Sequence, residues 1–111
     1  MVKITINDNS ESVTLKIEGR VADIQVPEFQ RVWQQVHSSL GSRALQIDLC
    51  GVTFMDQAGR NLLASIYAQT GAQLLANTPM TKYFAEEAIR AKQDYSNGVN
   101  TGGSDERSLR T

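Results

Sequence analysis

The hydrophobic residues of this chain change their spacing several times, and the order of those changes limits the fold. Residues 2–7 and 13–18 alternate apolar and polar side chains, the period-two pattern of a strand with one face in water. The polar residues 8–11 lie between these two runs, so the pair predicts an antiparallel hairpin. From about residue 27 to residue 40 the apolar side chains recur at spacings of three and four, as on one face of a helix.

Residues with special backbone preferences mark the ends of this first helix. Pro27 suits the first helical position, where a missing N–H does no harm, and Gly41 suits the position after the last helical residue. Alternation returns in residues 45–50, which therefore predict a third strand.

The following part of the chain predicts a helix, a strand and a helix. The second helix should run from Gln57 to about Thr70, where Gly71 would end it. The short apolar run 73–77 predicts a fourth strand, and Thr78-Pro79 is typical of a helix start. The side chains expected on the buried faces of these two helices are Leu62, Leu63 and Ile66, then Met80, Phe84, Ala88 and Ala91.

The predicted order is strand, strand, helix, strand, helix, strand, helix. Each strand–helix–strand unit needs a crossover connection, which places its two strands parallel in one sheet. Because alternation leaves one sheet face polar, the helices should cover mainly the other face. The sequence thus predicts an α/β two-layer fold, with a four-stranded mixed sheet and three helices mainly on one face. This domain should span residues 1–93, and the polar, glycine-rich residues 94–111 predict a flexible tail.

Composition excludes several kinds of function. A chain of 111 residues has room for one domain with a modest core. Its net charge of −1 argues against binding to nucleic acid or an anionic membrane. No apolar run approaches the roughly 20 residues that cross a bilayer, and the N-terminus lacks the apolar region of a signal peptide. A cytoplasmic protein without membrane insertion is expected.

Signatures of catalysis and metal binding are weak. Cys50 is the one cysteine, so neither a disulfide framework nor a cysteine metal cluster is expected, and it should be a small buried hydrophobe. His37 should pack on Trp33 at the rim of the first helix. Glu86 and Glu87 are consecutive and should be solvated, pointing in different directions. We therefore predict no enzyme activity, no catalytic residue, no metal site and no cofactor.

The segment from Val52 to Arg60, where the third strand gives way to the second helix, carries the most functional information. The Asp56 carboxylate can accept bonds from N–H groups of the first helical turn, and those groups and the helix dipole also favour an anion. Gly59 would permit close approach of another backbone, and such a junction is a common docking place. From these residues alone, a simple helix cap and a binding site both stay open.

The string hydrophobic-Met-Asp-x-x-Gly over residues 54–59, at this place in the element order, resembles the central motif of STAS domains, the family of bacterial anti-sigma factor antagonists. The resemblance covers roughly residues 2–93 and implies the STAS fold. The family usually reads hydrophobic-Met-Asp-Ser-Ser-Gly-Leu, and a partner kinase phosphorylates the second serine. Here Gln57 and Ala58 occupy the serine positions and Arg60 the leucine position. A further family pattern, Gly-x-hydrophobic-Asp, matches only loosely, because Asp23 comes one residue late.

The resemblance implies a non-enzymatic module that regulates transcription by partner switching. Residues 53–66 would bind an anti-sigma factor that is also a serine kinase of the histidine-kinase-like ATPase type. The implied partner-binding residues are Asp23, Asp56, Gln57, Ala58, Gly59 and Arg60. In the family, phosphorylation adds about two negative charges to the docked surface and opposes association.

Ala58 removes the phosphorylation step that the resemblance would otherwise imply, because a methyl group accepts no phosphate. Neither Thr53, expected to be buried or at the sheet edge, nor Ser65 is expected to replace the missing acceptor. Arg60 adds a cation that should influence the choice of partner. Two alternatives stay open: a STAS subunit or accessory of a bacterial lipid ABC transporter, or a sensor of a small ligand or anion.

Overall fold

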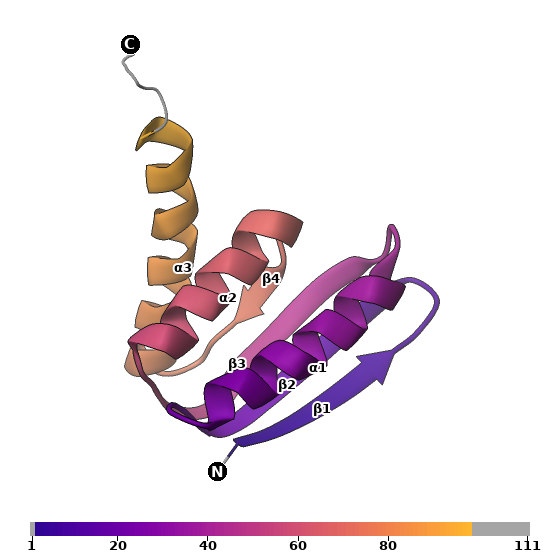
Figure 1. The fold of residues 1–111 in the computed structure, drawn as a ribbon, viewed down its shortest axis with the longest axis horizontal. Coiled ribbons are helices and arrows are strands. Elements are labelled where there is room, and N and C mark those ends of the chain that lie inside the picture. Colours follow the sequence, from indigo (N-terminus) through magenta and orange to yellow (C-terminus); the bar gives the residue numbers. More distant parts are fainter. Residues whose placement is uncertain (1, 99–111) are drawn as a thin grey trace.

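The computed structural model describes residues 2–98, with side chains through residue 91. Three helices and a sheet form two layers, and in Figure 1 α1 and α2 lie across one sheet face while α3 stands beside α2. The elements are β1 (Val2–Asp8), β2 (Ser12–Val21), α1 (Gln25–Leu40), β3 (Ala44–Met55), α2 (Gln57–Thr70), β4 (Gln73–Leu75) and α3 (Pro79–Gly98). Their order and types are those that the hydrophobic spacing predicts.

The sheet has the strand order β1-β2-β3-β4. β1 and β2 form the predicted antiparallel hairpin, with Ile4 opposite Ile17. The helices α1 and α2 are the crossovers that make β2, β3 and β4 parallel. The predicted four-stranded mixed sheet is therefore confirmed. Parallel pairing also brings the C-terminal ends of β2 and β3 together, where the candidate site lies.

The core lies between the sheet and the helices. Alternate residues of β2 and β3 point into it and are met by one face of each helix. The buried residues of the strands are Val13, Leu15, Ile17 and Val21 in β2, and Leu45, Ile47, Leu49, Val52 and Met55 in β3. Those of the helices are Phe29, Trp33, Val36 and Leu40 in α1, Leu63 and Ile66 in α2, and Thr81, Phe84, Ala85 and Ala88 in α3.

The ends of several elements differ from the prediction. α1 begins at Gln25, so Pro27 is its third residue and not its first. Proline is tolerated there because the N–H groups of the first turn have no partner within the helix. β3 extends beyond the predicted 45–50 to Met55, and β4 ends at Leu75 instead of residue 77.

α3 departs most from the prediction. It continues to Gly98, five residues beyond the predicted domain end, while residues 99–111 of the predicted tail lie outside the described part of the chain. Met80, expected inside, is 36% exposed, and Thr81 is fully buried in its place. The Thr81 hydroxyl accepts the Asn77 and Thr78 N–H groups at 3.2 and 3.0 Å, so this polar side chain is buried with its bonds made.

Candidate functional site

A β-bulge precedes the junction between β3 and α2. Gly19 pairs with Val52, but the next residue, Arg20, pairs with Phe54, so Thr53 is an extra residue in β3. As a result Thr53 and Phe54 are both exposed although they are consecutive. The expectation that Thr53 is buried or at the sheet edge is wrong, because β3 is an inner strand and the bulge turns this side chain outward.

Asp56 joins the junction to the end of β2. Its backbone N–H donates to the Val21 carbonyl oxygen at 3.1 Å. Its side chain bridges two elements, since Oδ1 accepts the Gly59 N–H at 2.8 Å and Oδ2 accepts the Asp23 N–H at 3.0 Å. The hydrogen bond from the Asp23 N–H lowers the pKa of the Asp56 carboxyl most, and the hydrogen bond from the Gly59 N–H lowers it further. Asp56 therefore caps α2, as predicted, and also fastens the β2–α1 loop.

Asp56→Asn should reduce stability at neutral pH and remove part of the acid sensitivity of the fold. The pKa of Asp56 is lower in the folded chain than in the unfolded chain. The contribution of this carboxylate to the stability of the fold is therefore fully present above its unfolded-state pKa of about 3.9. That contribution is lost as the pH falls through the lower pKa that Asp56 has in the folded chain. An asparagine does not ionise, and its NH2 group would face one of the two N–H donors. Urea unfolding midpoints, measured from neutral pH down to about pH 2.5, should therefore converge for the two proteins in acid.

A carboxyl group elsewhere supplies the control for this titration. Glu11 is exposed in the β1–β2 turn, and Glu11→Gln should leave the midpoint at neutral pH close to that of the wild type. Midpoints of the Asp56→Asn variant that follow the wild type throughout would show that the two side-chain bonds do not stabilise the fold.

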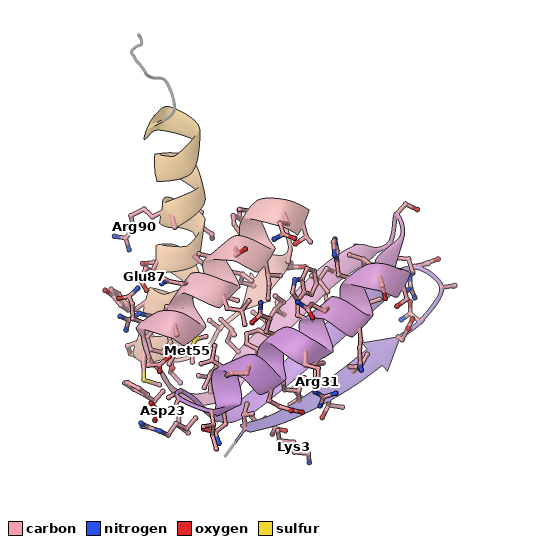
Figure 2. All side chains as sticks on the ribbon, viewed as in Figure 1. Lys3, Asp23, Arg31, Met55, Glu87 and Arg90 are labelled. Atoms are coloured by element: carbon pink, nitrogen blue, oxygen red, sulfur yellow. The ribbon has the colours of Figure 1, made fainter. Side chains whose placement is uncertain are left out.

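The first turn of α2 presents a short exposed surface. Gln57 and Ala58 are exposed, whereas Gly59 is buried against β2. A Cβ at position 59 would lie 2.8 Å from the Val21 carbonyl oxygen, so the absent side chain is what allows the helix to start this close to β2. Asp23 lies at the same end of the molecule as Met55, the last residue of β3 (Figure 2). The structure thus brings together Asp23, Asp56 and the first turn of α2.

Arg60 turns toward α3. Its Nε lies 3.2 Å from Glu87 Oε1, its Nη2 donates to Gln57 Oε1 at 2.9 Å, and its Nη1 donates to the Met55 carbonyl oxygen at 3.4 Å. The Arg60 and Glu87 side chains are 25% and 34% exposed. Glu87 is therefore not the solvated helix residue that the sequence predicted, and the Arg60 cation is engaged between two helices.

Three exposed residues to which the sequence analysis gave no role complete this end of the molecule: Arg20, Phe54 and Ile24. The Arg20 guanidinium lies 4.9 Å from the centre of the Phe54 ring, and its Nη2 lies 3.6 Å from Asp23 Oδ2. Ile24, next to Asp23, is 80% exposed. Arg20 and Asp23 carry opposite charges three residues apart, and this spacing could have predicted the ion pair. The bulge that exposes Phe54 has no signature in the sequence.

The remaining chemistry of the described residues is limited. His37 stacks on Trp33 with ring centres 5.1 Å apart, as expected. Cys50 is half-buried within β3 and not the buried hydrophobe predicted, and the neighbouring Asp48 raises the pKa of its thiol. Among the residues whose side chains are described, 2–91, no cluster of three or more histidine, cysteine or acidic residues could hold a metal. No helix within residues 2–98 is both long and apolar enough to cross a membrane.

Hollows in the described surface offer little to a small ligand at the site. The one beside the first turn of α2 has a volume of about 290 Å³, and Gln57, Arg60, Glu87 and Arg90 lie on its rim; Glu87 and Arg90 are labelled on α3 in Figure 2. A larger hollow of about 530 Å³ lies where α1 and α2 end, and no predicted site residue lines it. The Asp56 carboxylate already occupies the start of α2, where it would repel an incoming anion.

Comparison with solved structures identifies the class of fold. The crystal structure of an anti-sigma factor antagonist from Mycobacterium paratuberculosis matches with a TM-score of 0.66 and 21% sequence identity, covering 86% of this chain and 82% of that one. A structure described as Mglu matches with a TM-score of 0.53 and 17% identity, over 68% of this chain and 19% of that one. No family model and no curated protein sequence matches.

These matches agree with the architecture built from the strands and helices. The chain has the α/β fold of an anti-sigma factor antagonist, the STAS fold, which is the fold that the motif at residues 54–59 implied.

Proposed function

We propose that this protein is a non-enzymatic interaction module of the anti-sigma factor antagonist type, and that it binds an anti-sigma factor through the β3–α2 junction. One observation carries the proposal: in a STAS fold, Gln57 and Ala58 are exposed on the first turn of α2, beside the loop that Asp56 holds. In this proposal Asp23, Gln57 and Ala58 contact the partner. Asp56 and Gly59 set the position of the helix, and Arg60 orders its first turn.

The proposed partner is a serine kinase of the histidine-kinase-like ATPase type, as the family resemblance implies. Ala58 exposes a methyl group where the family has its phospho-acceptor, so this surface keeps the charge of the unphosphorylated state. The complex would therefore not be released by phosphorylation at this position. Any control over it would come from the partner, for instance from the nucleotide that the partner binds.

Titration calorimetry with the purified ATPase-type anti-sigma factor of the same organism tests this proposal. We expect a saturable complex, formed with ATP or ADP present and without phosphate transfer to the wild-type chain. Absence of a complex under both conditions would contradict the proposal. A complex with the ATPase subunit of a lipid transporter instead would favour the transporter alternative.

Ala58→Ser should restore the missing reaction. With the serine hydroxyl exposed on the first turn of α2, the partner kinase is expected to transfer the γ-phosphoryl group of ATP to position 58. Mass spectrometry of the intact chain and of its peptides would locate the phosphate. Ser65, exposed on the same helix, is the internal control and should stay unmodified. A kinase that is active on another substrate but leaves the introduced serine unmodified would contradict the family mechanism for this pair.

A further inference from the structure

The loop between β2 and α1 displays an isoleucine in water. Ile24 is 80% exposed, whereas the other exposed large apolar side chains among the described residues are between 36% and 52% exposed. It lies outside the buried face of α1, which is formed by Phe29, Trp33, Val36 and Leu40. Because the hydrophobic contribution to folding follows the apolar area removed from water, the fold gains almost nothing from this side chain.

The backbone around Ile24 is held in one conformation. Asp23 has a φ of +56°, a left-handed value that costs energy in a residue other than glycine. Its N–H is bound by Asp56 Oδ2 at 3.0 Å, and the Gln25 N–H donates to the Ala22 carbonyl oxygen at 3.0 Å. An apolar side chain on a fixed loop loses little conformational freedom when it binds, which favours its use as a contact.

We propose that Ile24 is an apolar anchor of the docking surface and that it enters an apolar pocket on the partner protein. This inference rests on the proposed function, since it adds a contact to the same surface. Asp56 is then a positioning residue, because its carboxylate binds the Asp23 N–H on one side and the Gly59 N–H on the other. The partner meets Ile24 and the first turn of α2 at a fixed spacing.

Ile24→Ser tests the anchor with the ATPase-type anti-sigma factor as the probe. Loss of a buried aliphatic anchor should raise Kd by about ten- to a hundredfold. The unfolding midpoint should not change, because the side chain is already in water. Ile6→Ser is the matched control: Ile6 is also exposed, at 44%, but it pairs with Leu15, about 20 Å along β2 from Val21. The Kd of the Ile6→Ser variant should equal that of the wild type.

The outcomes separate the anchor from the proposed function. Tight binding by both wild type and Ile24→Ser would overturn the anchor and leave the proposed function standing. Equal losses in the two isoleucine variants, or a matching loss of stability in Ile24→Ser, would also overturn it. No binding by the wild type would overturn the proposed function and the anchor with it.

Amide hydrogen exchange provides the readout for the positioning role of Asp56 and needs no partner. Asp56→Asn should speed exchange at the Asp23 and Ile24 N–H groups and also raise Kd, although the Ile24 side chain is intact. Unchanged exchange at these two groups would overturn the positioning role. Exchange in the β1–β2 turn, remote from the substitution, should stay as in the wild type.

Discussion

Replacing Gly59 with valine is expected to lower the free energy of unfolding by about 2–3 kcal/mol. A Cβ at this position would lie 2.8 Å from the Val21 carbonyl oxygen and 3.1 Å from Val21 Cγ1. Neither atom can retreat easily, because that oxygen accepts the Asp56 N–H and Val21 is fully buried. The start of α2 must therefore move away from β2. Urea unfolding followed by circular dichroism would measure the loss.

Ala58→Val is the matched control for this effect. It places the same side chain one residue earlier, on the exposed side of the first turn, where only the lower helix propensity of valine applies. That penalty is about 0.5 kcal/mol. Equal losses at positions 58 and 59 would show that contact with Val21 does not set the requirement for glycine.

Ala58→Glu should weaken the proposed complex with the anti-sigma factor by about 100-fold or more. The isolated chain should keep its stability, because the position is exposed and a carboxylate in the first turn of a helix is favoured by the helix dipole. In the complex the same charge would be desolvated close to the Asp56 carboxylate. Calorimetry would give the change in Kd, and thermal unfolding would confirm that the fold is intact.

Gln69→Glu provides the control for added charge. Gln69 is exposed on the same helix, eleven residues further along and about 16 Å away along its axis. Binding should be nearly unchanged in this variant. Similar losses at positions 58 and 69 would attribute the effect to the overall charge of the protein and would contradict docking at the β3–α2 junction.

The helix after the motif shows how far local sequence rules reach. Both ends of α2 were predicted correctly, because Asp56 and Gly71 have the side chains that a helix start and end require. Gly71 has the left-handed φ of +65°, and its N–H donates to the Tyr67 carbonyl oxygen at 2.7 Å. Each of these contacts joins residues within four positions of one another, which is the distance over which such rules apply.

The predicted buried face of α3 was wrong in its first turn, although the hydrogen bonds that decide it join residues within four positions of one another. Periodicity alone could not distinguish Met80 from Thr81 as the buried residue of α3, because Thr81 is tolerated inside only through its bonds to Asn77 and Thr78. α3 also continues past residue 93, where the sequence predicts the domain to end. The polar composition after residue 93 is typical of the end of a domain, but polar residues also continue a helix that extends away from the sheet (Figure 1).

The sequence by itself determined the element order, the mixed sheet, the capping role of Asp56 and the absence of a hydroxyl at position 58. Only the tertiary structure decided what these residues contact: Asp56 binds the N–H of a residue 33 positions earlier, and Arg60 pairs with Glu87. The parallel pairing of β2 with β3 brings Asp23 beside Asp56, and the packing of α3 against α2 brings Glu87 beside Arg60. Such pairings depend on how whole strands and helices pack, so no spacing in the chain specifies them.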